Sequence, residues 1–318
     1  MNAQKPKICV VGSAMTDQIT RAPRLPVAGE TLMATSYTLG FGGKGSNQAV
    51  MAARLGADVS MVAKLGRDLF GQNTLENYVS HGINTEFVFW DEQLPSGVAP
   101  IWVDETTGQN QILVVPGANA ALTPAEVRRA ASQIAQSAVL VCQNEIPMAC
   151  NREALSIARA KGVLTIFNPA PAVPTPADIW ALADIATPNE VEAALLTGVS
   201  TQDDEGALQA ARVLCERGAK TVLLTLGARG ALVVEESGHH WIAAKPVQAV
   251  DTTGAGDAFM GSLAFFLATG QSLREAATRA CRVASLSVSK TGTQTSFPTA
   301  AEVAAAEVAA TEVAATEN

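Results

Sequence analysis

Short apolar runs of strand length alternate along this chain with longer segments of helical periodicity. The runs are rich in Val, Ile, Leu and Ala, which is typical of strands buried on both faces of a parallel sheet. They lie at residues 8–12, 59–65, 138–142, 164–167 and 221–225. Helices are expected between them at residues 44–55, 70–80, 124–136, 148–161, 190–196 and 205–217. This alternation predicts an α/β fold with a three-layer, doubly wound, mostly parallel sheet.

The charge balance and the lengths of the apolar stretches disfavour two classes of partner. The 22 Lys and Arg against 30 Asp and Glu give a formal net charge of −8, so we expect no nucleic acid partner. No apolar stretch approaches the roughly 18 residues of a membrane helix, and we expect no membrane partner. The apolar run at residues 8–11 is too short for a secretory signal, which predicts a cytoplasmic protein.

The cysteines of the chain form no C-x-x-C pair. An odd and widely spaced set is typical of reduced, buried thiols, and it disfavours a disulfide framework or a zinc site. We therefore expect neither a disulfide nor a structural metal. The five residues are Cys9, Cys142, Cys150, Cys215 and Cys281.

Two segments depart from the α/β rhythm. Residues 31–41 and 96–115 are rich in Thr, Val, Ile and Gly and alternate in polarity, and residues 105–108 have the composition of a hairpin turn. They predict a small separate β-sheet. Because open α/β sheets bind ligands at the carboxyl ends of their strands, we interpret this small sheet as a lid over that edge, formed by segments of about 14–41 and 96–117.

The last residues, 299–318, form an Ala/Glu-rich tail beyond a domain of residues 1–298. From Ala300 onward the sequence repeats with a period of five, which places successive Glu residues about 140° apart around a helix. Neither the charges nor the Val residues form one stripe, so we expect a solvated terminus without a role in chemistry. An interaction helix is the alternative.

A first glycine cluster, at residues 40–45, satisfies the pattern G-x-G-x-x-G and opens a helix. A dinucleotide site with Asp58 as the ribose acid is therefore one interpretation, but the cluster follows an alternating segment and not the first buried strand. A P-loop is excluded because Thr38 stands where its first Gly is required and Gly45 where its Ser or Thr is required. The cluster still provides a turn whose backbone can approach a ligand.

Two polar side chains begin the helix that follows this turn. Lys44 and Asn47 are three residues apart and therefore lie on one side of the first helical turn. The alternative is that Gly42 and Gly43 are required only for tight packing under the lid.

A second glycine cluster, at residues 251–257, precedes an apolar helix at residues 258–268. Small residues at a helix start leave successive N–H groups uncovered at the positive end of the helix dipole, which makes an anion site suited to phosphate. Asp257 stands in the first turn, where a carboxylate often only complements the dipole. Beside an anion site, however, a carboxylate is placed to act as a base for an attacking hydroxyl group.

Together the two clusters resemble the two motifs of the ribokinase family of carbohydrate kinases. The first motif is Gly42-Gly43-Lys44-Gly45-Ser46-Asn47-Gln48-Ala49, and the second runs from Asp251 through Asp257 to Ala258-Phe259. The similarity extends from Val10 to Pro298. It also includes residues 52–57, Gly66, and residues 168–172, 187–190, 225–230 and 292–296.

The resemblance implies a ribokinase-like fold and an ATP-dependent sugar kinase of carbohydrate metabolism and ribose catabolism. The expected reaction converts D-ribose and ATP to D-ribose 5-phosphate. Asp257 would be the base that takes the proton from the primary hydroxyl of the sugar. The amides of Gly254, Ala255 and Gly256 would form the anion hole for the transferring phosphoryl group.

The resemblance also implies four sets of binding residues and a homodimer joined through the lid. The sugar would be bound by Met15, Asp17, Gly43, Lys44, Asn47, Glu145 and Asp257. ATP would be bound by Asn189, Thr225, Gly227, Gly230, Gly256 and Cys281. Mg²⁺ would be held indirectly by Asn189 and Glu192. K⁺ would be held as an activator by Asp251, Thr253, Ser287, Lys290, Gly292 and Ser296.

The residues themselves support a polyhydroxylated ligand. Asp17 and Glu145 each follow a buried strand, so both are expected at the carboxyl edge of the sheet, where carboxylates, Lys and Asn together suit adjacent hydroxyl groups. Solvated surface charge is the alternative for each of them.

The identity of the sugar is left open at one position. Many bacterial members of the family have Asn where this chain has Met15, whereas animal members share the Met-Thr-Asp of residues 15–17. We expect D-ribose to be preferred over 2-deoxyribose, with a 2-deoxyribose kinase as the alternative and a catalytically silent sugar sensor as the second alternative.

Overall fold

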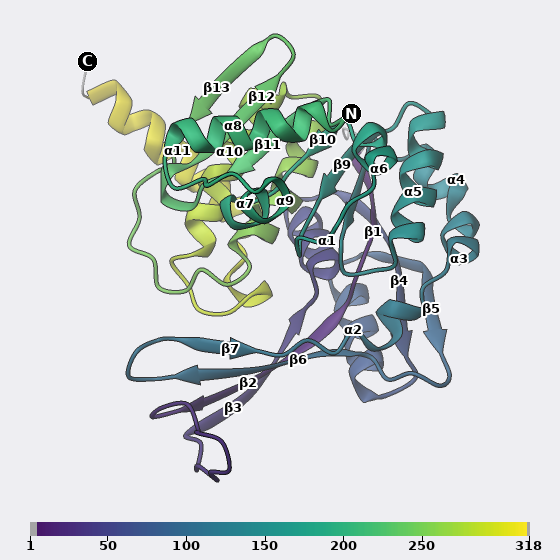
Figure 1. Ribbon diagram of the computed structural model, residues 1–318, viewed down its shortest axis with the longest axis vertical. Helices are drawn as coiled ribbons and strands as arrows, with labels where there is room; N and C mark the ends of the chain where they lie inside the picture. Colours follow the sequence, from purple (N-terminus) through teal and green to yellow (C-terminus); the bar gives the residue numbers. More distant parts are fainter. Residues whose placement is uncertain (1–4, 317–318) are drawn as a thin grey trace.

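A nine-stranded sheet forms the centre of the protein within residues 5–316, the part of the chain whose backbone this computed structural model describes; side chains are described for residues 5–309. The strand order is β13-β12-β11-β10-β9-β8-β1-β4-β5, and only β12 and β13 run antiparallel to their neighbours. The predicted mostly parallel sheet is therefore confirmed (Figure 1). Its strands are β1 (Lys7–Val11), β4 (Asp58–Gly66), β5 (Asn84–Asp91), β8 (Val139–Gln143), β9 (Leu164–Asn168), β10 (Ile185–Ala186), β11 (Thr221–Thr225), β12 (Ala231–Glu235) and β13 (Gly238–Ile242).

Helices cover both faces of this sheet and make it the middle of three layers, as predicted. Successive side chains of a strand point to opposite faces, so Ile8 and Val10 of β1 join one buried cluster while Cys9 and Val11 join the other. The first cluster is completed by α1 (Lys44–Arg54), α2 (Leu69–Ser80), α9 (Ala255–Ala268) and α10 (Leu273–Ser287). The second is completed by α3 (Pro124–Arg129), α4 (Ala131–Gln136), α5 (Met148–Ala160), α6 (Ala177–Leu182), α7 (Glu190–Thr197) and α8 (Asp204–Glu216).

The structure differs from the sequence-based expectation in two ways. The helix expected at residues 124–136 is two short helices, α3 and α4, which meet at the buried residue Ala130. In addition, β5, β10, β12, β13, α6 and α10 were not expected. β13 begins with three small or polar residues and β10 has only two residues, whereas β5 and β12 contain apolar runs that the prediction overlooked.

Four strands form the small separate sheet that the alternating segments predicted. Their order is β3-β2-β6-β7, and Figure 1 shows them projecting below the body of the protein. The turn between β6 and β7 follows the prediction, since Asp104 accepts hydrogen bonds from the backbone of Thr106 and Thr107 at 2.8 and 2.9 Å. The strands are β2 (Met15–Ala22), β3 (Ser36–Gly42), β6 (Gly97–Asp104) and β7 (Asn110–Ile112).

The tail is helix α11 (Ala300–Thr316), and two side chains in its first turns depart from the solvated terminus that was expected. Val303 is buried at 4% exposure. Glu307 accepts two hydrogen bonds from the Arg279 guanidinium group, which also lies 4.0 Å from the centre of the Phe266 ring. The prediction was wrong for this part because single side chains, one apolar and one charged, attach the helix to α10 without a continuous apolar stripe.

Two further expectations concern cysteines and membranes. All five cysteines are unpaired, and Cys215 alone among them is only partly buried. Among the helices of the described residues, none combines the length and apolar character that crossing a membrane requires.

Candidate active site

Helix α9 begins with backbone groups that face open space. Gly254 stands at its N-cap with φ of 78°, and a Cβ there would lie 2.8 Å from Thr293 Cγ2. The amides of Gly254 and Gly256 have no acceptor among the described residues, whereas Ala255 already donates to Thr252 O at 3.2 Å. A Cβ at Gly256 would meet no atom within 4 Å. Two of the three predicted anion-hole amides are therefore free to meet an anion at the positive end of the helix.

The Asp257 carboxylate lies in the first turn of α9 and is held at both oxygens. Asn47 Nδ2 donates to Oδ2 and Gln48 Nε2 donates to Oδ1, each at 2.9 Å. Asn47 is fixed in turn, because its Oδ1 accepts from Gln294 Nε2 at 2.9 Å. With 8% exposure, Asp257 is a nearly buried carboxylate with a defined orientation beside the helix start.

The glycine-rich turn before α1 packs closely against β2 and the end of the loop after β1. A Cβ at Gly43, whose φ is 86°, would lie 2.8 Å from Ala14 Cα, and one at Gly42 would lie 2.1 Å from Asp17 Oδ1. The packing interpretation of these glycines is therefore correct. It does not exclude a binding role, since the same packing brings Lys44 and Asn47 to the site.

Asp17 lies on β2 with 8% exposure and faces this turn. Burial raises the pKa of its carboxyl group to about 7; Thr293, which donates to it at 3.4 Å, lowers the pKa, and the nearby charges of Asp257 and Glu145 raise it further. A carboxyl group of this kind can exchange its proton near neutral pH.

Glu145 follows β8, as the sequence predicts, and links this segment to the loop after β1 and to the start of α1. Its Oε2 accepts from Ser13 Oγ at 2.5 Å and from the backbone N–H of Lys44 at 2.9 Å. Burial opposes the charge of Lys44, but the carboxylates of Asp257, Glu145 and Glu192 prevail and raise its pKa. Lys44 is thus a cation held among acidic groups. Of the predicted sugar-binding carboxylates, Asp17 interacts electrostatically with both Glu145 and Asp257.

The predicted nucleotide residues lie mostly at the carboxyl ends of β10 and β11. Asn189 and Glu192 form a capping box at the start of α7, with both bonds at 2.8 Å. Thr225 donates its N–H to Pro188 O at 3.0 Å, and this joins the Gly227–Gly230 turn to the capping box. Burial raises the pKa of Glu192 above its ordinary value. The hydrogen bond from the backbone N–H of Asn189 and the charge of Lys44 oppose this shift without cancelling it.

Cys281, like Gly256, makes no hydrogen bond to the other predicted nucleotide residues among the described residues. It lies on α10, is nearly buried, and packs in the first core cluster. Burial raises the pKa of its thiol to about 11, so it is a neutral side chain near pH 7.

Asp251 joins two of the other predicted cation residues, Thr253 and Gly292. Its Oδ2 accepts from the backbone N–H of Gly292 and its Oδ1 from that of Thr253, both at 2.9 Å. The backbone oxygens of Thr253, Lys290 and Gly292 accept no hydrogen bond from the described residues. These oxygens and the carboxylate are the donor type that alkali cations prefer. The Ser287 oxygen, in contrast, already accepts from Lys290 N at 3.2 Å.

Sequence reasoning assigned no role to several residues that hold this site. Gln48, Gln294, Thr293 and Ser13 each bond a predicted site residue. Gln48 and the pair Thr293-Gln294 stand inside segments that carried the family resemblance, so the signal was present in the motifs. The contact of Gln48 required the packing of α1 against α9, and those of Thr293 and Gln294 required the packing of the segment after α10 against β2 and α1, none of which the sequence pattern provides.

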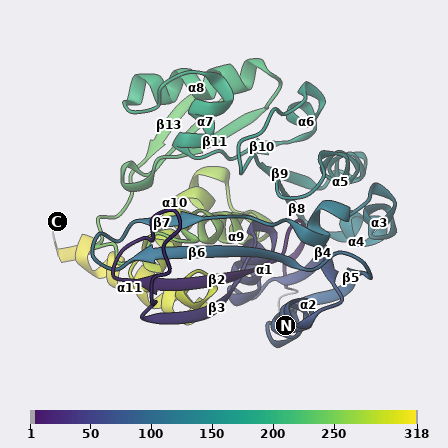
Figure 2. The same ribbon diagram turned by 60° about the horizontal axis from the view of Figure 1, so that its bottom comes forward.

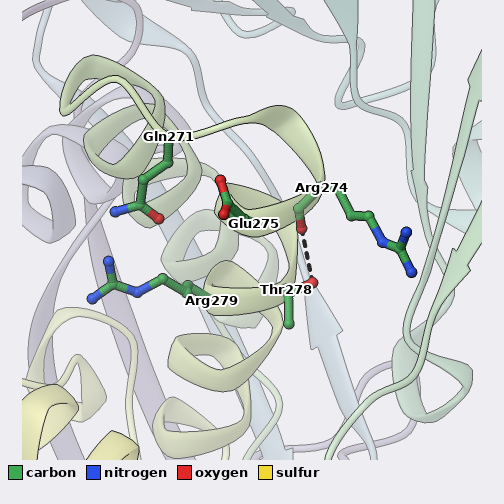
Figure 3. Close-up of a pocket in the computed structure, with 5 residues that line it drawn as sticks. All are labelled: Gln271, Arg274, Glu275, Thr278 and Arg279. Atoms are coloured by element: carbon green, nitrogen blue, oxygen red, sulfur yellow. Dashed lines mark hydrogen bonds between the residues drawn. The ribbon is translucent and has the colours of Figure 1, made fainter.

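A surface hollow at the opposite end of α9 is not part of this site. Figure 3 shows its lining, with the guanidinium groups of Arg274 and Arg279 pointing away from each other. Arg279 is engaged by Glu307, and Glu275 caps α10 through Ser272. The hollow lies on the order of 15 Å from Asp257 along the helix, and its side chains do not converge on a ligand.

Comparison with known proteins gives concordant results. The model of the pfkB family of carbohydrate kinases matches residues 5–300. The chain is 44% identical to a ribokinase of Mus musculus over 299 residues, which are 92% of this chain and 91% of that protein. It is 38% identical to a deoxyribokinase of Salmonella typhi over 296 residues, which are 92% and 95% of the two chains.

A solved structure is similar over nearly the whole chain. The ribokinase of Arabidopsis thaliana complexed with ribose and ATP matches with a TM-score of 0.88 and 32% sequence identity, covering 94% of this chain and 98% of that one. The ribokinase of Thermotoga maritima matches with a TM-score of 0.85 and 35% identity, covering 94% and 98%.

Proposed function

The chain belongs to the pfkB family of carbohydrate kinases, and from this premise we propose that it transfers the terminal phosphoryl group of ATP to D-ribose, giving D-ribose 5-phosphate. The protein is an ATP-dependent sugar kinase. The single observation that carries the proposal is the Asp257 carboxylate, oriented at both oxygens and placed beside the free amides of the α9 start.

This geometry supports one division of roles. Asp257 takes the proton from the primary hydroxyl of the sugar as that oxygen attacks the terminal phosphorus of ATP, and the bond from phosphorus to the bridging oxygen breaks. The amides of Gly254 and Gly256 stabilise the charge on the transferring group. Lys44 balances the carboxylates around it, while Asp17, Asn47 and Glu145 accept or donate hydrogen bonds at the remaining hydroxyl groups.

Ribose is favoured as the sugar by two relatives. The mouse protein is a ribokinase, and the Arabidopsis ribokinase was solved with ribose and ATP. The similarity to a deoxyribokinase supports 2-deoxyribose as the second candidate. Met15, buried at 4% exposure on β2, offers no hydrogen bond to a hydroxyl group and therefore does not by itself penalise a missing one.

Mg²⁺ and K⁺ are proposed from the residues that fit them. Asn189 and Glu192 would hold the hydrated magnesium that accompanies ATP, since a carboxylate and an amide oxygen suit its water shell. Asp251 and the free backbone oxygens of Thr253, Lys290 and Gly292 would hold potassium beside the anion hole. Bound there, these cations supply positive charge for the phosphate groups of ATP.

The small sheet is proposed as both a lid and a dimer interface. Tyr37 and Trp102 flank Thr20 in the strand register, so both lie on one face of the sheet, where they are 59% and 39% exposed. The opposite face carries Asp17. A second copy of this chain would cover the exposed aromatic face.

The cytoplasm is proposed as the compartment, which the unpaired cysteines support.

The test is ADP release by the purified protein with ATP and either D-ribose or 2-deoxy-D-ribose. We expect a higher kcat/KM with ribose, dependence on magnesium, and a faster rate in KCl than in NaCl at equal ionic strength. A preference of more than tenfold for the deoxy sugar would make the protein a deoxyribokinase. Saturable sugar binding without turnover of any pentose would indicate the sensor.

A further inference from the structure

Gln48 is completely buried and touches the one carboxylate on which the proposed chemistry depends. Its Nε2 donates to Asp257 Oδ1 at 2.9 Å and also to Asn168 Oδ1 at 3.2 Å. Its Oε1 accepts from Gln143 Nε2 at 2.7 Å. Both the donor and the acceptor end of this amide therefore have partners, and its orientation is fixed.

The groups behind Gln48 are also held in place. Asn168 donates its Nδ2 to Thr187 O at 2.7 Å, which anchors it to the segment after β10. Asn151 donates to the backbone oxygen of Gln143 at 2.8 Å. Gly12 leaves room for the Gln143 side chain, because a Cβ at position 12 would lie only 2.0 Å from Gln143 Oε1.

This network is unusual in its cost. Gln48, Gln143 and Asn151 have no exposed surface, and the side-chain oxygens of Gln143 and Asn151 are buried without a partner. Buried polar groups that lack a partner destabilise a protein. An apolar core would avoid that cost, and the one end of the network that reaches the candidate site is the carboxylate of Asp257.

We propose that Gln48 is a positioning residue for this kinase, which fixes the Asp257 carboxylate from behind through the buried chain Gln143–Gln48–Asp257. The inference rests on the proposed function. Gln48 cannot touch sugar or ATP because its side chain is not exposed. Asn47 donates to the other oxygen of the carboxylate. With a donor at each oxygen, the Asp257 carboxylate cannot rotate without losing a hydrogen bond.

The test is the variant Gln48→Leu, which keeps the size of the side chain and removes its polar atoms. We expect kcat to fall about tenfold or more, which corresponds to the loss of one hydrogen bond to a charged group, while the KM for the sugar stays within about threefold. Thr165→Val is the matched control, because it removes the partly buried hydrogen bonds of a hydroxyl group to Leu182 and Asp184 without touching the site, and its kcat should equal that of wild type.

A double-mutant cycle separates positioning from a general loss of structure. If Gln48 acts through Asp257, then Gln48→Leu changes the residual kcat less than twofold in an Asp257→Asn background. A loss of the same size in both backgrounds, or a single variant whose kcat is within twofold of wild type, overturns the inference. If Gln48→Leu does not fold, Gln143→Leu takes its place, with an expected loss of about threefold or more and the same criterion for rejection.

A crystal structure of the variant gives a result that does not depend on turnover. The Asp257 carboxylate is expected to rotate away from its position in the wild type, and an unchanged carboxylate overturns the inference. Wild-type turnover in the same assay distinguishes the two proposals: absence of any pentose kinase activity removes the proposed function, whereas normal wild-type activity with an unaffected Gln48 variant removes only the role of Gln48.

Discussion

At the scale of single residues, Asp257 is the group whose replacement is most informative. Asp257→Asn keeps the shape of the side chain but removes the acceptor for the proton, so kcat should fall about 10²-fold or more with sugar binding retained. Steady-state kinetics and a sugar-binding isotherm measure the two quantities. The thermal midpoint must be compared in parallel, because the substitution also removes a negative charge from the start of α9. A loss of less than tenfold would contradict the assigned role.

Asp17 is expected to make stability depend on pH. Its pKa is about 7 in the folded protein and 3.8 as the ordinary value, so the folded state binds the proton more tightly. The contribution of this proton to the free energy of unfolding is fully present below pH 4 and is lost as the pH rises through 7. Asp17→Asn should therefore raise Tm by a few degrees at pH 8 and leave it unchanged near pH 4, as measured by calorimetry. Equal Tm values at pH 8 would show that the carboxyl group is not perturbed.

The site residues differ in how far the sequence could predict them. Asp257, Lys44 and Asn47 stand in short glycine-rich motifs whose chemistry is visible without a structure. Gln48 is one residue from Asn47, about 100° around an ideal helix, and the helical pattern assigns it to a different face. It reaches the same carboxylate only because α9 lies directly against α1. Contacts of that kind depend on tertiary packing and have no local signal.

At the scale of elements, the docking of α11 gives a direct test of the tail. Val303 is buried, whereas Val308 of the same helix is 59% exposed. Val303→Asp should lower Tm by several degrees, since burying a charge or detaching the helix costs a few kcal/mol. Val308→Asp, the matched control, should change Tm by no more than about 1 °C. Equal effects would mean that α11 does not pack in solution, and neither variant should alter kcat.

The strands of the large sheet that were predicted from sequence have a short apolar run, but such a run was not sufficient, since β12 and the second half of β5 have one and were not expected. β1, β4, β8, β9 and β11 are buried on both faces, so their composition alone distinguishes them. The antiparallel edge strand β13 has three polar or small residues in its first three positions and was missed. An edge strand is selected by its neighbour β12 through backbone pairing, and composition carries little of that information.

At the scale of the whole molecule, the proposed dimer can be tested with two tryptophans of equal exposure. Trp102 lies on the outer face of the small sheet and is 39% exposed, and Trp241 lies on β13 of the large sheet and is 38% exposed. Trp102→Glu should yield a monomer by light scattering at micromolar concentration, and Trp241→Glu should remain a dimer. A wild-type monomer at that concentration would contradict the proposed interface.

The strand order also has a consequence for synthesis on the ribosome. The sheet begins with β1, β4 and β5; β8 then joins the free edge of β1, and each strand from β9 to β13 joins the edge formed by the strand before it. A nascent chain therefore always finds a completed edge for its next strand. The helices α9 and α10 emerge after the whole sheet and contribute to the first core cluster, and α9 packs against the early helix α1 (Figure 2). Because Asp257 arrives with them, an unfinished chain can acquire most of its sheet before it acquires any capacity for turnover.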